Sequence, residues 1–174
     1  SEAFLDLDKS IKQIDERIET LKSLTKQQSQ NMKAFNFLLD LQNTWLNIKL
    51  DLSSNRDLIM NHNYLCVSPS DFGFHNTLIK NGQLYFLDFE YAGRDDPAKF
   101  IADFFIQPEI KVDLNYMKLF ADKALDFSDN KDIIIDRTIK LLPMFKVKWC
   151  CIMMNEFLPE VAQRRVFSNP ELDL

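Results

Sequence analysis

A stretch in the middle of this 174-residue chain constrains its fold more than any other, because short apolar runs alternate there with polar turns. Residues 64–67, 77–79 and 84–87 each predict a short buried strand. Asn81 and Gly82 separate the last two runs, and this dipeptide is typical of a tight β-hairpin turn. We therefore expect a small β-hairpin in this region.

Polar side chains lie at the ends of these apolar runs. Asp71 follows the first run, Asn76 directly precedes the second, and Asp88 directly follows the third. An Asp followed five positions later by an Asn, with another Asp on a later loop, is the spacing of the protein-kinase template. That chemistry needs a carboxylate to accept the proton of an attacking hydroxyl, and oxygen ligands for a magnesium ion on the phosphates. The pattern favours phosphoryl transfer, whereas either Asp alone would also fit a turn-capping role.

Two segments of this region resemble motifs of the aminoglycoside phosphotransferase and choline kinase group of small-molecule kinases, which are distant relatives of protein kinases. In that group the catalytic loop commonly reads H-G/N-D-x-x-x-x-N, and the metal loop reads I-D-F-E-x-A-G-x-x-D-P before a helix. Residues 70–76 read SDFGFHN and residues 87–97 read LDFEYAGRDDP, in the same order and at a similar separation. The resemblance is sharp over residues 65–105.

The resemblance implies a role for each matching side chain. Asp71 corresponds to the catalytic base, and Asn76 and Asp88 correspond to the residues that hold Mg²⁺ on the phosphates of ATP. Glu90 corresponds to a candidate for the outer shell of the metal. The implied activity is the ATP- and Mg²⁺-dependent transfer of the γ-phosphate to a hydroxyl group of a small molecule. His75 adjoins Asn76, and we expect it to hold the loop by hydrogen bonds rather than to act directly.

The chain departs from the family pattern at two positions. Pro69 replaces the His that stands two residues before the catalytic Asp in the family. Phe100 replaces the second Asp of a D-P-x-x-D pattern, and this change moves the expected structural acid to Asp103. Neither departure removes an atom that the phosphoryl transfer requires.

The glycines bear on how a nucleotide would be held. Gly73, Gly82 and Gly93 are the only ones, and none lies in a Gly-rich strand turn or in a G-x-x-x-x-G-K-[ST] phosphate loop. We therefore expect the N-terminal nucleotide-gripping lobe of a kinase to be absent from this chain and to be its partner in the intact enzyme.

Composition limits the other partners and the compartment. The formal net charge is −5 and the pI is about 5.1, which argues against nucleic acid or an anionic membrane as the main partner. No transmembrane run or signal segment is visible. The three cysteines are odd in number, and Cys150 and Cys151 are adjacent, which favours a reducing cytoplasm over a disulfide framework.

Helical periodicity dominates the rest of the chain. Apolar residues from Phe4 to Leu21 recur every three and four positions, and a second such segment covers residues 32–50. We expect an intramolecular helical hairpin here, although the first pattern would also suit a coiled-coil partner. Asp96 and Pro97 predict a helix start, and Pro143 predicts a kink or a break. The later helices are expected at residues 98–105, 114–125, 131–156 and 161–167.

The predicted fold is α+β and mainly α-helical, with the architecture of the C-terminal lobe of a protein-kinase-like fold and a small β-hairpin that carries the active-site loops. We expect one domain over residues 1–174, made of a helical hairpin (1–52), the catalytic and metal loops (64–97) and a helical subdomain (98–174). The predicted function is that of a small-molecule phosphotransferase. The alternatives are a non-catalytic kinase-like module that docks a partner protein through its helices, and a protein kinase.

Overall fold

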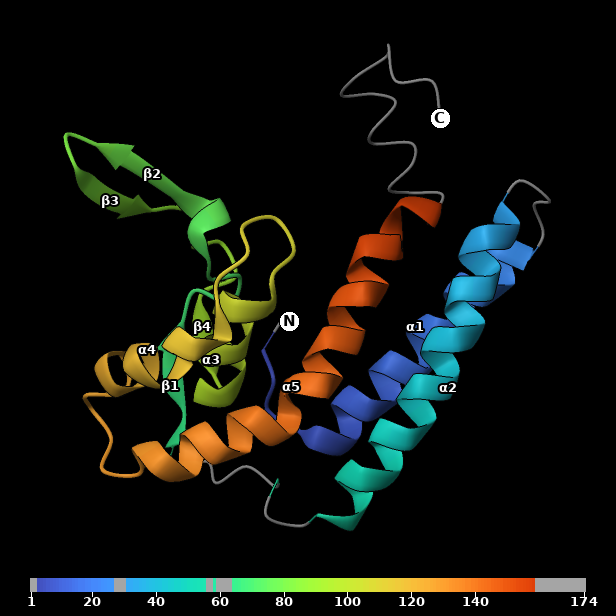
Figure 1. The fold of residues 1–174 in the computed structure, drawn as a ribbon, viewed down its shortest axis with the longest axis horizontal. Helices are drawn as coiled ribbons and strands as arrows, with labels where there is room; N and C mark the ends of the chain where they lie inside the picture. Colours follow the sequence, from blue (N-terminus) through green and yellow to red (C-terminus); the bar gives the residue numbers. More distant parts are fainter. Residues whose placement is uncertain (1–2, 27–30, 56–57, 59–63, 159–174) are drawn as a thin grey trace.

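The computed structural model describes residues 3–26, 31–55, 58 and 64–158. Most of these residues are helical, and the strands are short (Figure 1). The predicted mainly helical α+β class is confirmed. The helices are α1 (Leu7–Lys26), α2 (Met32–Ser54), α3 (Pro97–Ile106), α4 (Met117–Ala124) and α5 (Lys131–Met153), and the strands are β1 (Cys66–Ser68), β2 (Thr77–Lys80), β3 (Gln83–Phe86) and β4 (Gly93–Asp95).

Helices α1 and α2 form the expected helical hairpin. One face of α1 is buried at Ile14, Ile18 and Leu21, and this face packs on α2, where Trp45 is buried. The indole Nε1 of Trp45 donates a hydrogen bond of 2.7 Å to the Asp15 carboxylate, so the polar atom of this large side chain is satisfied. The apolar period of α1 is therefore used inside the chain rather than against another protein.

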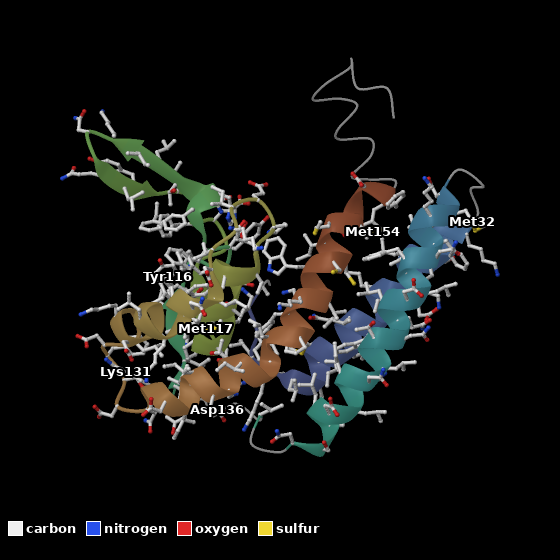
Figure 2. All side chains as sticks on the ribbon, in the orientation of Figure 1. Met32, Tyr116, Met117, Lys131, Asp136 and Met154 are labelled. Atoms are coloured by element: carbon white, nitrogen blue, oxygen red, sulfur yellow. The ribbon has the colours of Figure 1, made fainter. Side chains whose placement is uncertain are left out.

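Helix α5 connects the hairpin to the rest of the molecule. It packs against α1, α2, α3 and α4, and it changes direction midway along its length (Figure 1). Pro143 lies inside this helix and lacks the N–H that would bond to the preceding turn, which explains the predicted kink. Asp136 lies on one arm of the bend, and Met154 follows the end of the other arm (Figure 2). The bend allows one helix to cover both α3 and α1.

The strands form two separate antiparallel pairs. Strand β2 pairs with β3, and Asn81 (φ 53°) and Gly82 (φ 75°) make the predicted turn between them. The prediction that the β2 and β3 runs are buried is wrong, because most of their side chains are exposed. Figure 1 shows the reason, since this hairpin projects from the body of the molecule.

The second pair joins β1 to β4 and was not predicted. Cys66 lies opposite Asp95, and Ser68 lies opposite Gly93. The sequence Gly-Arg-Asp of β4 has no apolar run to signal a strand. This antiparallel register places the start of β1, at Cys66, opposite the residue that lies just before the N-cap of α3.

The C-terminal helical predictions are confirmed with small changes. Helix α3 begins after Asp96, whose carboxylate accepts the N-cap hydrogen bond from Ala98 N at 2.8 Å. The predicted helix at residues 114–125 is divided into a 3₁₀ turn (Leu114–Tyr116) and α4. The predicted helix at residues 161–167 lies outside the described residues. Among the helices that the structure describes, none has both the length and the apolar character needed to cross a membrane.

Candidate functional site

The Asp71 loop, residues 69–76, connects β1 to β2 and turns sharply at its start. Ser70 adopts a φ of 75°, in the left-handed region that is uncommon for residues other than glycine. The hydroxyl of Ser68 accepts a hydrogen bond of 3.0 Å from the Ser70 N–H and stabilises this turn. The turn directs Asp71 away from β1, and the Asp71 side chain is 42% exposed.

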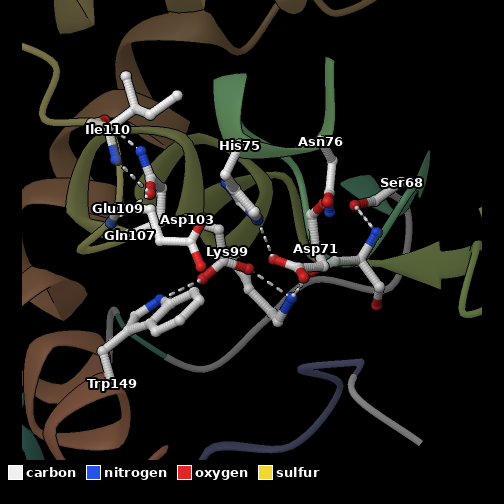
Figure 3. Close-up of polar contacts among 11 residues, drawn as sticks. Ser68, Asp71, His75, Asn76, Lys99, Asp103, Gln107, Glu109, Ile110 and Trp149 are labelled. Carbon is white, nitrogen blue, oxygen red and sulfur yellow. Dashed lines mark hydrogen bonds and ion pairs between the residues drawn. The ribbon is translucent and has the colours of Figure 1, made fainter. Parts of the chain in front are cut away.

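Two side chains of the same loop hold Asp71 (Figure 3). His75 Nε2 lies 3.0 Å from the Asp71 Oδ1 atom, and Asn76 Nδ2 donates a hydrogen bond of 3.0 Å to the Asp71 main-chain oxygen. An ionised carboxylate only accepts hydrogen bonds, so His75 carries its proton on Nε2 when it donates to ionised Asp71. The contact agrees with the expectation that His75 holds the loop.

Asp88 lies beside Asn76 across the hairpin. The N–H of Leu87 donates a hydrogen bond of 2.9 Å to the Asn76 main-chain oxygen, which extends the β2–β3 ladder by one step. Asp88 follows at once with a φ of 60°, again in the left-handed region. Its side chain is exposed and has no hydrogen-bond or ion-pair partner among the described residues. The ladder therefore links Asp88 to Asn76, and the Asn76 amide links both to Asp71.

The donor set of these residues fits a small hard cation. The Asn76 amide nitrogen is used by Asp71, which leaves its Oδ1 oxygen available, and Asp88 offers an unpaired carboxylate. Glu90 is exposed two residues further on, in a turn. In the described part of the chain, no three His, Cys, Asp or Glu side chains gather as a metal site. An amide and a carboxylate beside phosphate oxygens do not need such a trio.

A buried ionic group, the Lys99 cluster of Asp95, Lys99 and Asp103, lies beneath the Asp71 loop. Lys99 Nζ lies 2.5 Å from Asp103 Oδ2 and 3.3 Å from Asp95 Oδ2, and it donates a hydrogen bond of 2.7 Å to the Ser70 main-chain oxygen. Burial by itself would lower the pKa of Lys99, but the Asp103 and Asp95 carboxylates outweigh it and raise that pKa. Lys99 is therefore a buried ammonium ion with oxygen partners on three sides.

The two acids of the cluster are fixed by further donors. Trp149 Nε1 donates a hydrogen bond of 3.3 Å to Asp103 Oδ1, and Phe4 N donates one of 2.7 Å to Asp95 Oδ1. Burial raises the pKa of the Asp103 carboxyl, and Lys99 opposes this effect. The cluster thus joins α3 to α5, to the segment before α1 and to the Asp71 loop.

Asp96 forms a second buried ion pair next to the cluster. Its carboxylate lies 2.5 Å from Arg137 Nη1 on α5, and burial raises the pKa of Asp96 while Arg137 opposes the rise. The Arg137 Nε atom also donates to the Leu58 main-chain oxygen at 3.1 Å. The sequence predicts Asp96 as a helix cap, and the structure shows that Asp96 also forms an ion pair with Arg137 on α5.

Aromatic side chains anchor the other side of the Asp71 loop. The Phe72 ring lies 5.0 Å from Phe100, 5.4 Å from Phe104 and 5.0 Å from Phe86, between ring centroids. Phe104 in turn stacks on Phe120 of α4 at 4.4 Å. Phe100 stands where the family motif has an acid, and here it packs against the residue that follows Asp71. The loop is therefore fixed by ring packing on one side and by Lys99 on the other.

Gly73 and Gln107 define the rim of the loop. A Cβ atom at Gly73 would lie 2.6 Å from His75 Nδ1 and 3.1 Å from Gln107 Cγ, so any larger residue there would displace the His75 ring. Gln107 and Trp149 also line a groove of about 750 Å³ between the end of α3 and α5. A cavity of about 380 Å³ lies between α1 and α5, and neither Asp71 nor Asp88 lines it. Neither Asp71 nor Asp88 lines the larger groove either, and Gln107 is the lining residue that lies next to the Asp71 loop, at Gly73.

Several site residues were missed by the sequence reasoning. Lys99 is the lone cation of an otherwise apolar helix segment, with Asp95 four residues before it and Asp103 four residues after it. On a helix this spacing places Asp103 near Lys99, so that part of the signal was present, whereas Asp95 lies in β4 before the helix. The Trp149 and Phe4 contacts depend on tertiary packing, and no local pattern indicates them.

Comparison with known proteins identifies no relative. The chain matches no protein-family model, no curated protein and no solved structure.

Proposed function

We propose that this chain carries the catalytic half of an ATP- and Mg²⁺-dependent phosphotransferase that acts on a hydroxyl group of a small molecule. The observation that carries the proposal is the hydrogen-bonded link from Asp71 through Asn76 to the residue before Asp88. It connects the three residues that the kinase template uses through main-chain contacts, in their expected order. Backbone strain at Ser70 and Asp88 supports the proposal, because residues outside hairpin turns that adopt left-handed φ values cluster at functional sites.

In this proposal the chain's own residues orient and deprotonate the acceptor. The exposed Asp71 carboxylate accepts the proton of the attacking hydroxyl, while His75 fixes the rotation of that carboxylate. Asn76 Oδ1 and the Asp88 carboxylate hold Mg²⁺, with Glu90 as a candidate for its outer shell. When bound, the ion neutralises charge on the phosphates. The acceptor enters from the groove lined by Gln107 and Trp149, whose volume suits a small molecule.

We further propose that the fold is the C-terminal lobe of a kinase-like enzyme and that the donor nucleotide lies over the β2–β3 hairpin. Apolar side chains are exposed on this hairpin and on the loop after it, around Asp88. Such a surface suits a nucleotide base and a covering lobe. Its exposed members are Leu78, Ile79, Leu84, Tyr85, Phe86, Leu87, Phe89 and Tyr91.

The test is phosphoryl transfer by the full-length protein from ATP to a panel of small hydroxyl compounds, with and without Mg²⁺. Asp71→Asn and Asp88→Ala should each lower turnover by about 100-fold or more, with an unchanged circular dichroism spectrum. Asp51→Asn is the matched control, because Asp51 is an exposed acid on α2, remote in sequence from both loops. Near-normal turnover in either site variant would refute the assignment.

A second candidate is a non-catalytic binding module, which a feature of α2 favours. Met32, Leu39, Leu46 and Leu50 repeat at spacings of seven and four residues, and all four are exposed. They form a stripe on the face of α2 that does not meet α1. A protein that binds a partner here but binds no nucleotide in the presence of Mg²⁺ would favour this candidate over the kinase.

A further inference from the structure

The Ser70–Asp71 peptide controls where the Asp71 carboxylate points. Ser70 holds a left-handed φ of 75°, which a serine keeps only when the surroundings determine it. The Ser70 N–H is bound by Ser68 Oγ at 3.0 Å, and the Ser70 main-chain oxygen is bound by Lys99 Nζ at 2.7 Å. Rotation of this peptide plane would break the second contact and turn Asp71 away from His75.

Lys99 is itself held on all sides. An ammonium group has three N–H donors, and here it faces three oxygens, which belong to Ser70, Asp103 and Asp95. The Lys99 residue is 3% exposed, so water does not compete for these contacts. Trp149 holds Asp103, and Phe4 N holds Asp95. The ammonium position is therefore determined by α3, α5 and the segment before α1.

We propose that Lys99 is a positioning residue for Asp71, and that it acts by clamping the Ser70 main-chain oxygen in the left-handed turn. This inference rests on the proposed function for its catalytic meaning, but its geometry can be tested without any turnover. Phe100, next to Lys99, packs on Phe72 and cannot bind a backbone polar group. Within the described residues, Lys99 is thus the side chain of α3 that reaches the Ser70–Asp71 peptide.

A purely structural role for Lys99 would be to neutralise the buried acids. A pair of variants that both alter the Lys99 cluster distinguishes the two roles. The double variant Lys99→Met/Asp103→Asn removes one positive and one negative charge, so the net charge of the cluster is kept while the clamp is lost. Asp103→Asn alone is the control, because it disturbs the same buried site but leaves Lys99 in contact with Ser70 and Asp95.

The readout is the ring Nε2 proton of His75 in ¹H–¹⁵N NMR, which the hydrogen bond to Asp71 protects from exchange with water. The chain has two histidines, His62 and His75, so His62→Gln assigns the signal. We expect the signal in the unaltered protein and in Asp103→Asn, and its loss in the folded double variant. A signal that persists in the double variant, or that disappears equally in the control, overturns the inference.

Two further measurements cover the remaining outcomes. If the double variant does not fold, the hydrogen bond is measured in the unaltered protein. Scalar coupling between the Lys99 ammonium group and the Ser70 carbonyl carbon should be detectable, and its absence would overturn the proposed contact. Where turnover is found, the double variant should lower kcat by about 100-fold at an unchanged KM for ATP, and it should have no further effect in Asp71→Asn. Additive losses would show a merely structural role. A protein without turnover defeats the proposed function, while the NMR result still decides the clamp.

Discussion

The side-chain amide of Asn76 donates a hydrogen bond of 3.0 Å to the main-chain oxygen of Asp71. The amide closes the loop between an Asp and an Asn five positions apart. The hydrogen bond also fixes the orientation of the amide, so that Oδ1 is the atom left for a cation. A single side chain thus performs a structural task with its nitrogen, and in the proposed function its oxygen is the metal ligand.

Two substitutions at Asn76 separate these tasks. Asn76→Asp keeps an oxygen ligand but cannot donate to Asp71, so Mg²⁺ should still bind while turnover falls by about 100-fold. Asn76→Leu removes both functions, and Mg²⁺ binding should be lost as well. Titration with Mn²⁺ followed by electron paramagnetic resonance measures the metal, and a coupled ADP assay measures turnover. Equal metal affinity in the two variants would contradict the division of tasks.

Gly73→Ala should disturb the contact between His75 and Asp71. The new methyl group would lie 2.6 Å from His75 Nδ1 and would push the ring away from Asp71. We expect a loss of about 1–3 kcal/mol in the free energy of unfolding, together with a fall in turnover. Gly93→Ala is the control, because the nearest atom to its Cβ would be 4.0 Å away. Urea denaturation compares the two, and similar midpoints would count against the packing described.

We expect the loss of two helix caps, Asp96 and Asp113, to lower the free energy of unfolding by different amounts, because Asp96 also pairs with Arg137. Asp96→Ala removes both the cap of α3 and the partner of the buried Arg137, and it should cost about 3–5 kcal/mol. Asp113→Ala removes an exposed cap before the 3₁₀ turn and should cost about 1 kcal/mol or less. Thermal unfolding measures both, and equal shifts of Tm would show that the ion pair contributes nothing beyond the cap.

The cysteines predict a loss of stability at alkaline pH. Burial raises the pKa of Cys66 and of Cys151 from 9.0 to about 11. Because the folded-state pKa lies above the unfolded value, the stabilising contribution is fully present below pH 9.0 and is lost as the pH rises through about 11.

The same shifts predict slow modification of the native thiols. At pH 8 the thiolate fraction of Cys66 and Cys151 should be about 100-fold lower than in the unfolded chain. Alkylation by iodoacetamide, followed residue by residue with mass spectrometry, should therefore be slow until denaturant is added. Equally fast labelling of the native and unfolded protein would exclude the buried, protonated state of these thiols.

Local patterns predicted the parts of this fold that depend on local chemistry. The 3.6-residue period predicted α1 and α2, the Asn81–Gly82 pair predicted the hairpin turn, and Pro143 predicted the bend of α5. The exposure of β2 and β3 could not be predicted, because apolar strands are exposed or buried according to what packs on them.

The same distinction between local pattern and tertiary packing applies to the candidate site. The spacing of Asp71, Asn76 and Asp88 along the chain indicated a common pocket, and the hairpin ladder supplies the link between them. The contact of Lys99 with the Asp71 loop could not be predicted, because the local spacing relates Lys99 to Asp103 only and it is tertiary packing that brings Ser70 to Lys99. Sequence patterns indicate which groups do chemistry, whereas tertiary packing decides which groups hold them.

Mg²⁺-dependent nucleotide binding by the full-length protein tests the central claim most directly. Isothermal titration calorimetry with a non-hydrolysable ATP analogue should show binding that requires Mg²⁺, that weakens by about tenfold or more in Asp88→Ala, and that Asp51→Ala leaves unchanged. Nucleotide binding that is absent, or that is indifferent to both Mg²⁺ and Asp88, would contradict the phosphotransferase assignment.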